Sequence, residues 1–283
     1  MSNNERSVLI TGCSSGIGHA CAHGLAQHGY RVIASARKPA DVARLRGEGL
    51  TAVRLDVDAP PSIAEAVAET LELTKGRLWG LFNNAGYGQP GAVEDISRDA
   101  LRAQLETNLL GAHDLTCRII PIMRRQGHGR IVQNSSLLGL AGLAYRGAYV
   151  ASKFALEGLT DTLRLELRGT GIFVSLIEPG PITSRFRDNA YAMWHRHVDG
   201  DASPHCDAYR AMEARLATEG SAQPFTLPPE AVLKRLVHAL ESSRPKPRYY
   251  VTVPTHLLGA ARRVLPTRGM DWLMTKISRG GAG

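Results

Sequence analysis

A phenol and an ammonium group four residues apart are the residues of this sequence best suited to chemistry. Tyr149 and Lys153 would lie one helical turn apart on the same face. Ser136 lies upstream of both, in an Asn-Ser-Ser turn. A free tyrosine has a pKa of about 10, and a neighbouring ammonium favours the phenolate, which brings its proton affinity nearer to neutral pH. These three side chains therefore predict an acid/base site.

A glycine-rich turn near the N-terminus is suited to an anionic cofactor. Residues 8–10 form a short apolar run, and Gly12, Gly16 and Gly18 follow it. Glycine lets the backbone turn tightly and approach a pyrophosphate, while the N–H groups that start the next helix face the anion. Ordinary turns also use glycine, so the three glycines alone are weak evidence for a cofactor site. They become stronger evidence because the chain also carries Ser136, Tyr149 and Lys153. The two motifs together predict nicotinamide chemistry.

Buried strands alternate with amphipathic helices along most of the chain. Strands are expected at 8–10, 30–36, 52–57, 78–84, 130–134, 172–177 and 249–253, and helices at about 62–74, 97–125 and 229–242 and around Tyr149. This order predicts an α/β fold with a Rossmann-type, doubly wound parallel sheet and helices on both faces. Ligands of such sheets bind at the carboxyl ends of the strands, where each motif falls.

A length of 283 residues suits one large domain with a C-terminal extension. Residues 1–253 are expected to form the cofactor-binding catalytic domain, and within it the irregular stretch 184–225 is a candidate substrate lid. Residues 254–283 combine apolar and basic side chains in an amphipathic extension. This extension could dock on the body, on a partner subunit or on a membrane surface, so peripheral membrane contact stays open.

Composition excludes several other functions. The net charge of +8 comes from scattered lysines and arginines with few aromatic residues, so no nucleic-acid site is expected. Four cysteines without a Cys-x-x-Cys pair, and no apolar run long enough to cross a bilayer, indicate a cytoplasmic protein. His19 and His23 are four residues apart, but no third ligand stands at a sensible spacing, so no metal site is expected.

The combined motifs resemble the short-chain dehydrogenase/reductase family in its single-domain form. They are Thr11-Gly-x-x-x-Gly-Ile-Gly18, Asn83-Asn-Ala-Gly86, Asn108, Ser136, Tyr149-x-x-x-Lys153 and Pro179-Gly180, in the order and spacing of that family. The resemblance covers residues 7–184 and implies a sheet of about seven strands. The opening Thr-Gly-Cys-Ser-Ser-Gly-Ile-Gly and the Ala-Ser-Ala-Arg strand end are similar to the hydroxysteroid and retinol dehydrogenase branch.

The resemblance implies catalytic roles for four residues. Tyr149 would donate or accept the proton of the substrate oxygen, and Ser136 would hydrogen-bond to that oxygen. Lys153 would act on Tyr149 and also bind the nicotinamide ribose, while Asn108 would hold a water that relays protons. Ser136 is preferred to Ser135 because it begins a Ser-x-x-Gly sequence with the family's spacing.

The same resemblance implies a set of cofactor contacts. The glycine turn would hold the diphosphate, the third strand's end the adenine, the Asn-Ala-Gly sequence the adenosine side, and the Pro-Gly loop the carboxamide and diphosphate. The residues are Gly12, Ser14, Ser15, Gly16, Ile17, Gly18, Asp56, Val57, Asn84, Ala85, Gly86, Tyr149, Lys153, Pro179, Gly180, Ile182 and Thr183.

The end of the second strand indicates which nicotinamide cofactor is bound. NAD enzymes place a carboxylate there to accept hydrogen bonds from the adenosine ribose. Here Ala36 stands at that position, and Arg37 and Lys38 follow it. Two cations suit a 2′-phosphate, so the sequence predicts NADP(H).

The predicted activity is hydride transfer between NADP(H) and the carbonyl or alcohol carbon of an apolar aldehyde, ketone or secondary alcohol. The alternative is a catalytically silent NADP(H)-binding sensor or scaffold, against which the complete Ser-Tyr-Lys set argues. The Tyr149 helix also carries an apolar stripe of Leu156, Leu159, Leu163 and Leu167. That stripe predicts a homodimer or homotetramer, although a helix buried inside a monomer has the same pattern.

Overall fold

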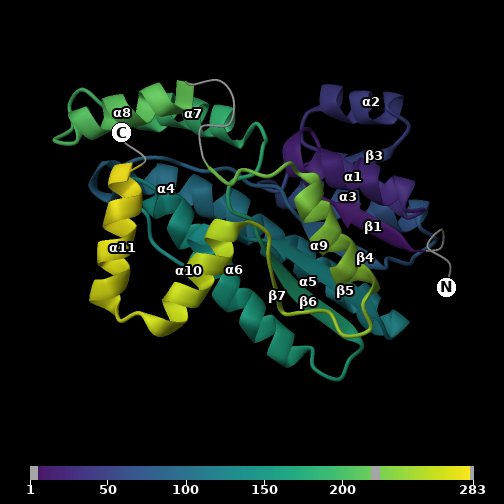
Figure 1. Ribbon diagram of the computed structural model, residues 1–283. Helices are drawn as coiled ribbons and strands as arrows, with labels where there is room; N and C mark the ends of the chain where they lie inside the picture. Colours follow the sequence, from purple (N-terminus) through teal and green to yellow (C-terminus); the bar gives the residue numbers. More distant parts are fainter. Residues whose placement is uncertain (1–5, 218–223, 281–283) are drawn as a thin grey trace.

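Seven parallel strands form one sheet within residues 6–217 and 224–280, the parts of the chain that the computed structural model describes (Figure 1). Their order across the sheet is β3-β2-β1-β4-β5-β6-β7. The strands are β1 Ser7–Ile10, β2 Arg31–Ala36, β3 Thr51–Arg54, β4 Gly80–Asn83, β5 Gly129–Asn134, β6 Ile172–Glu178 and β7 Arg248–Tyr250. The predicted fold class and number of strands are confirmed.

Two apolar cores lie on the two faces of the sheet, because alternate side chains of a strand point to opposite faces. In β1, Val8 and Ile10 enter the core covered by α1, α2 and α9, whereas Leu9 enters the core covered by α3, α5 and α6. All three side chains are fully buried, which fixes the register of the strand. These helices are α1 Gly16–Gln27, α2 Pro39–Gly47, α3 Pro60–Leu73, α5 Gly111–Gln126, α6 Gly147–Glu166 and α9 Glu230–Glu241.

The helix expected at 97–125 is interrupted. It consists of α4 Arg98–Leu105, the π-helical turn η3 Glu106–Leu110, and α5, which contains Pro121. Ser97 caps the start of α4 by accepting a hydrogen bond from the Ala100 N–H group. The wider π turn brings Asn108 into the interior, where only 2% of it is exposed.

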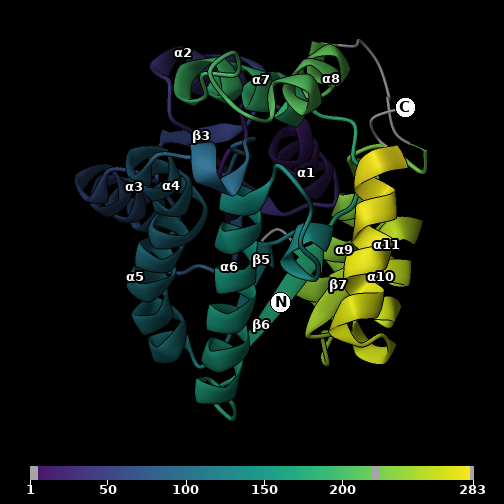
Figure 2. The same cartoon turned by 90° about the vertical axis from the view of Figure 1, so that its left-hand side faces the viewer.

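Two helices occupy most of the stretch that was predicted to be irregular. They are α7 Phe186–His197 and α8 Cys206–Ala217, which lie together at one end of the molecule (Figures 1 and 2). Trp194 of α7 packs edge-on against Tyr209 of α8, with ring centroids 4.4 Å apart. The prediction was wrong because only Ala190 and Trp194 of α7 are buried, too few to produce an apolar period in a polar sequence. Part of the predicted lid, 218–223, lies outside the described residues.

The C-terminal extension forms α10 Val253–Val264 and α11 Thr267–Gly280, which stand on the side of the molecule opposite α3 and α5 (Figure 2). Leu258, Met270 and Met274 are buried against Ala141, in the loop that follows β5. The extension therefore docks on the body through part of its apolar surface. None of the helices within the described residues combines the length and the apolar character needed to cross a bilayer.

Arg248 of β7 holds together three carboxyl groups from α6 and β6. Its guanidinium donates to Glu157 Oε2 at 2.9 Å and to Asp161 Oδ2 at 2.7 Å, and its Nε atom lies 3.1 Å from Glu178 Oε1. Burial, and then the neighbouring Glu157, raise the pKa of Glu178, which is completely buried, so its protonated form is favoured. The short edge strand β7 is thus tied to the body by charge as well as by the sheet.

We expect Arg248→Leu to lower the free energy of unfolding by about 3 kcal/mol, because it leaves buried carboxyl groups without their cation. Urea unfolding monitored by circular dichroism measures the change. Arg244→Leu is the matched control, since Arg244 is exposed and should change stability by less than about 0.5 kcal/mol. Equal destabilisation by both substitutions would contradict this role of Arg248.

Candidate active site

Ser136, Tyr149 and Lys153 meet at the carboxyl edge of the sheet. Ser136 stands in the turn after β5, and Tyr149 and Lys153 lie one turn apart on α6. All three are buried, with exposed fractions of 8%, 8% and 5%. The Ser136 hydroxyl hydrogen-bonds to Tyr149, and Lys153 Nζ lies 5.7 Å from the centre of the Tyr149 ring. The sequence prediction that these three side chains lie close together is confirmed.

The electrostatics of the site differ from the sequence expectation. Burial raises the pKa of Tyr149 to about 12, and the hydrogen bond with Ser136 opposes this rise only in part. Burial also lowers the pKa of Lys153 to about 8, against the influence of Glu157. The expectation that Lys153 lowers the pKa of Tyr149 is therefore wrong for the protein by itself, because desolvation of the phenolate outweighs the available stabilisation. Tyr149 is therefore a neutral phenol near neutral pH.

Lys153 is positioned by a series of hydrogen bonds that crosses the sheet. Its Nζ atom donates to the Asn134 carbonyl at 2.8 Å, and Asn134 Nδ2 donates to Asn84 Oδ1 at 2.9 Å. Asn84 Nδ2 donates in turn to the Thr11 carbonyl at 2.9 Å, and the Asn84 N–H group donates to Thr11 Oγ1 at 2.8 Å. The end of α6 that carries Lys153 is thus connected through β5 and β4 to the glycine turn after β1.

Asn108 lies inside the protein beside this network. Its Nδ2 atom donates to the Tyr87 carbonyl at 2.9 Å and to Ser152 Oγ at 3.0 Å, while its Oδ1 atom accepts from the Tyr87 N–H group at 3.0 Å. A side chain at Gly86 would approach Asn108 Oδ1 to 2.9 Å and Lys153 Nζ to 3.9 Å. A surface role for Asn108 is excluded by this burial. The relay water stays a prediction.

The turn between β1 and α1 requires glycine at two positions for different reasons. Gly12 has a φ of +71°, and a Cβ atom there would come within 2.8 Å of the Ala85 Cα atom. A Cβ atom at Gly18 would come within 2.3 Å of the Gly12 carbonyl oxygen. Because α1 begins at Gly16, its first N–H groups stand at the carboxyl edge of the sheet, as an anion-binding turn requires.

The other residues of this turn have structural contacts of their own. Ser15 is the N-cap residue of α1, and Ile17 packs against the core beneath that helix. The Ser14 carbonyl accepts a hydrogen bond from Arg44 Nη2 of α2 at 2.7 Å. The Ala85 N–H group donates to Thr11 Oγ1 at 2.9 Å, so the turn is joined to the end of β4.

Arg37 and Lys38 stand at the end of β2, where the sequence placed the 2′-phosphate contact. Both side chains are exposed, and Ala36 before them is buried. Arg37 has a favourable electrostatic interaction with Asp58. The two cations therefore face solvent at the carboxyl edge of the sheet, next to the glycine turn in the strand order.

The segments after β3 and β6 come to the same edge. The Asp56 N–H group donates to Ser62 Oγ at 3.0 Å, and Val57 is buried beneath α5. The Pro179 carbonyl accepts a hydrogen bond from the Leu137 N–H group at 2.8 Å, next to Ser136. A Cβ atom at Gly180 would clash with Thr252 Oγ1. Ile182 pairs with Leu227 in an isolated β-bridge, and the Thr183 N–H group donates to the Leu227 carbonyl at 3.0 Å.

Two residues of the site were not identified as such from the sequence. Phe186 of α7 lies edge-on to Tyr149, with ring centroids 5.4 Å apart, and its ring would touch a Cβ atom at Gly88. Asn134 supplies the carbonyl that holds Lys153. Asn134 adjoins the Asn-Ser-Ser turn and could have been noticed, whereas the contact of Phe186 depends on a helix that the sequence did not predict.

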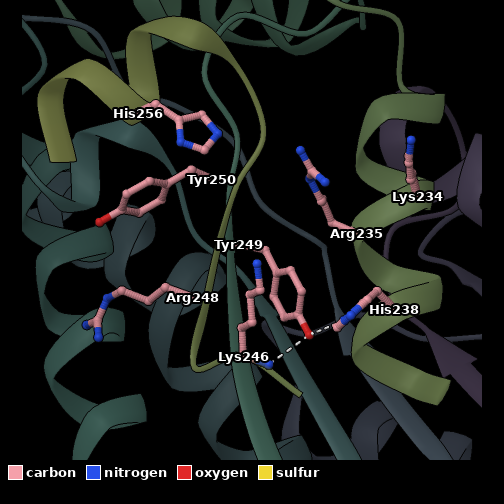
Figure 3. A pocket seen from close by; sticks show the side chains of 8 residues that line it. All are labelled: Lys234, Arg235, His238, Lys246, Arg248, Tyr249, Tyr250 and His256. Carbon is pink, nitrogen blue, oxygen red and sulfur yellow. Dashed lines mark hydrogen bonds between the residues drawn. The ribbon is translucent and has the colours of Figure 1, made fainter. Parts of the chain in front are cut away.

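Neither of two cavities in the described part of the chain includes Ser136, Tyr149 or Lys153. One, of about 610 Å³, is bordered by the loop after Ser136, by Phe154 and by the C-terminal helices; Leu140, Ala141, Tyr145, Met270 and Met274 are among its lining residues. The other, of about 330 Å³, lies between α9, β7 and α10 (Figure 3). There the Tyr249 hydroxyl bonds to His238 at 2.8 Å, and Arg248 points away towards α6. Only the first cavity adjoins the Ser136 turn.

The comparisons with known proteins agree with this geometry. A family model described as short chain dehydrogenase matches residues 6–193. The chain is 45% identical to the uncharacterized oxidoreductase YbbO of Escherichia coli K12, over 95% of this chain and 94% of that protein. It is 33% identical to human retinol dehydrogenase 16, over 97% of this chain and 89% of that enzyme.

A solved structure with the same fold covers nearly the whole chain. It is a short-chain dehydrogenase/reductase from Burkholderia phymatum in complex with NAD, with a TM-score of 0.77 and 26% sequence identity. The superposition covers 97% of this chain and 96% of that one. The likeness therefore includes the sheet, the helices on both faces and most of the C-terminal part.

Proposed function

This chain is an oxidoreductase of the short-chain dehydrogenase/reductase family, and we propose that it transfers a hydride between NADP(H) and the carbonyl or alcohol carbon of an apolar substrate. The observation that carries the proposal is the buried group of Tyr149, Ser136 and Lys153 beside the glycine turn. In that group the phenol is neutral and faces the hydroxyl that would share its substrate oxygen.

The residues present fit a dinucleotide. The close approaches at Gly12 and Gly18 form a turn without side chains, and the start of α1 offers N–H groups to a diphosphate. Asp56 and Val57 would meet the adenine, and Pro179, Gly180, Ile182 and Thr183 the nicotinamide end. When bound, the nicotinamide supplies or accepts the hydride. The chain's own residues would bind it, orient it and move the proton.

The high pKa of Tyr149 suits reduction. Below about pH 12 the phenol holds its proton, so it can protonate the oxygen of a carbonyl whose carbon receives the hydride. The C=O double bond becomes a single bond, a C–H and an O–H bond form, and the phenolate is left behind. Lys153, bonded to Asn134, lies close enough for its ammonium to stabilise that phenolate. Asn108 would hold the water through which the proton is replaced.

An apolar substrate fits the surroundings of Tyr149. Phe186 covers its ring, and the mostly apolar cavity near the Ser136 turn extends from the same loop. Helix α7, which carries Phe186, and its neighbour α8 would act as the lid. The likeness to retinol dehydrogenase 16 supports a substrate of this class.

A catalytically silent NADP(H)-binding sensor or scaffold is the alternative function. Such a protein would need the glycine turn but not the acid/base group. The burial of Ser136, Tyr149 and Lys153, together with the hydrogen bond between Ser136 and Tyr149, favours the enzyme, because burying polar side chains costs stability that binding alone does not require.

We also propose a homo-oligomer in the cytoplasm. Within the predicted leucine stripe, Leu156 and Leu167 are buried in the chain itself and Leu163 packs against a core of the same chain, so these three leucines support the fold. Leu159 and Leu165 stay exposed on α6 and are better candidates for contact with a second copy.

The cysteines support the proposed location in the cytoplasm. All four are free thiols, as is usual in a reducing compartment.

Replacement of Tyr149 tests the proposed chemistry. We expect Tyr149→Phe to lower kcat for NADPH-dependent reduction by at least about 100-fold, because the substrate oxygen loses its proton donor. NADPH consumption with a panel of apolar aldehydes and ketones measures turnover, and NADPH fluorescence shows that cofactor binding is kept. Binding without turnover by both proteins would favour the sensor and contradict the enzyme.

Reversal of charge at Arg37 tests the cofactor assignment. We expect Arg37→Asp to weaken NADPH binding by about 10- to 100-fold and to improve NADH binding, because a carboxylate repels the 2′-phosphate and can accept ribose hydrogen bonds. Arg31→Asp makes the same change of charge at the opposite end of β2 and should leave the preference unchanged. An unaltered NADPH/NADH ratio in Arg37→Asp would refute the assignment.

The exposed side of the C-terminal helices is a candidate for peripheral membrane contact. Val264 and Trp272 are 80% and 61% exposed, and Lys276 lies over the Trp272 ring. We expect full-length protein to co-sediment with anionic vesicles and the pair Val264→Gln and Trp272→Gln to bind about tenfold less. Deleting the helices is a poorer test, because it would uncover Ala141.

The matched control for the vesicle experiment carries Val93→Gln, at an apolar side chain 77% exposed in the short turn Val93–Asp95, outside both the C-terminal helices and the proposed contact with a second copy. This substitution should leave co-sedimentation unchanged. If wild type does not pellet with vesicles, or if all three proteins pellet equally, the C-terminal helices do not bind membranes.

A further inference from the structure

Two histidines and a glutamate form a cluster between α1 and the end of α2, away from the acid/base residues. His19 and His23 lie one turn apart on α1, and Glu48 is the residue that follows α2. Both Nε2 atoms face the same carboxylate oxygen, Glu48 Oε2, at 2.7 and 2.9 Å. Within residues 6–217 and 224–280, this is the one group of three such side chains whose ligand atoms lie within 4.8 Å of one another.

We propose that His19, His23 and Glu48 bind a divalent transition-metal ion, with Zn²⁺ as the best match. Two imidazole nitrogens and one carboxylate oxygen are a donor set that Zn²⁺ accepts, with water at the fourth position. The three side chains are 34%, 31% and 29% exposed, so an ion and its water can enter from solvent. The third ligand comes from 25 residues beyond His23, which is why the sequence alone indicated no site.

The carboxylate is prepared for this role. Arg44 Nη1 donates to the other oxygen, Glu48 Oε1, at 2.5 Å. That contact fixes the orientation of the carboxylate and leaves Oε2 directed at the imidazoles, as partners of a metal ligand commonly do.

The two imidazoles point at the same carboxylate oxygen, Glu48 Oε2. This arrangement suits a bound cation better than it suits hydrogen bonds alone. For both rings to bond to one oxygen, each Nε2 atom must carry a hydrogen, which places two N–H dipoles side by side. The ring centroids are 4.6 Å apart. A metal ion takes the place of both hydrogens and attracts all three ligand atoms, at about 2.0–2.2 Å from each.

The position of the site gives the ion a structural consequence. It would join α1, which begins at the glycine turn, to the end of α2, while Arg44 also donates to the Ser14 carbonyl in that turn at 2.7 Å. An ion bound only by the native state stabilises it by mass action. We therefore expect the ion to stabilise the two strand–helix units that border the glycine turn, whether or not the proposed hydride transfer is correct.

The experiment is a Zn²⁺ titration of metal-free, tag-free full-length protein, by calorimetry and by competition with a chromogenic chelator. We expect one ion per chain with micromolar affinity, and a characteristic visible spectrum when Co²⁺ replaces Zn²⁺. The double variant His19→Gln and His23→Gln should bind at least about 100-fold more weakly, and Glu48→Gln at least about tenfold. Saturating Zn²⁺ should raise the Tm of wild type by about 5 °C and leave that of the double variant unchanged.

The matched control is the double variant His195→Gln and His197→Gln, which removes two histidines from α7 and should bind Zn²⁺ like wild type. Thermal unfolding without metal establishes that every variant is folded. The proposal is overturned if wild type binds no Zn²⁺ at millimolar concentration, or if the His19 and His23 variant binds as tightly as the control.

Discussion

A series of hydrogen bonds across the carboxyl edge of the sheet determines where the reactive groups stand. It runs from Lys153 to the Asn134 carbonyl, from the Asn134 side chain to Asn84, and from Asn84 to Thr11 before the glycine turn. Lys153 lies on α6, Asn134 ends β5, and Asn84 and Thr11 directly follow β4 and β1, so their spacing depends on the register of β1, β4 and β5. The proposed cofactor turn and the acid/base group are thereby held as one unit.

Burial gives this unit its electrostatic character. The same removal of water that raises the pKa of Tyr149 to about 12 lowers that of Lys153 to about 8, so both groups are shifted towards their neutral forms. The phenol of Tyr149 therefore keeps its proton near neutral pH, while the ammonium of Lys153 loses its proton more easily than an exposed lysine does. Glu157 lies one turn beyond Lys153 and accepts a hydrogen bond from Arg248, so it connects the pair to the Arg248 cluster. Its charge raises the pKa of Lys153 and so favours the ammonium form.

The sequence predicted the fold and the grouping of Ser136, Tyr149 and Lys153 because both depend on short-range patterns. Apolar runs such as Val8 to Ile10 are buried on both faces and identify the parallel strands, and the four-residue spacing of Tyr149 and Lys153 implies one helical face. Helices α7 and α8 were missed because their stabilising contacts, such as Trp194 with Tyr209, are tertiary. The contact between His23 and Glu48 was also missed, because the two residues are 25 positions apart in the sequence. The direction of the Tyr149 pKa shift was wrong because it depends on burial, which the sequence did not show.

The most direct test of the account is the rate of hydride transfer in a single turnover of the Lys153→Met variant. Enzyme saturated with NADPH is mixed rapidly with the best aldehyde or ketone substrate, and the loss of nicotinamide absorbance is followed. With Tyr149 and Ser136 intact, we expect the transfer to be at least about 100-fold slower than in wild type, because the phenolate that forms has lost its cation. A variant that transfers hydride at the wild-type rate would contradict the central role given to Lys153.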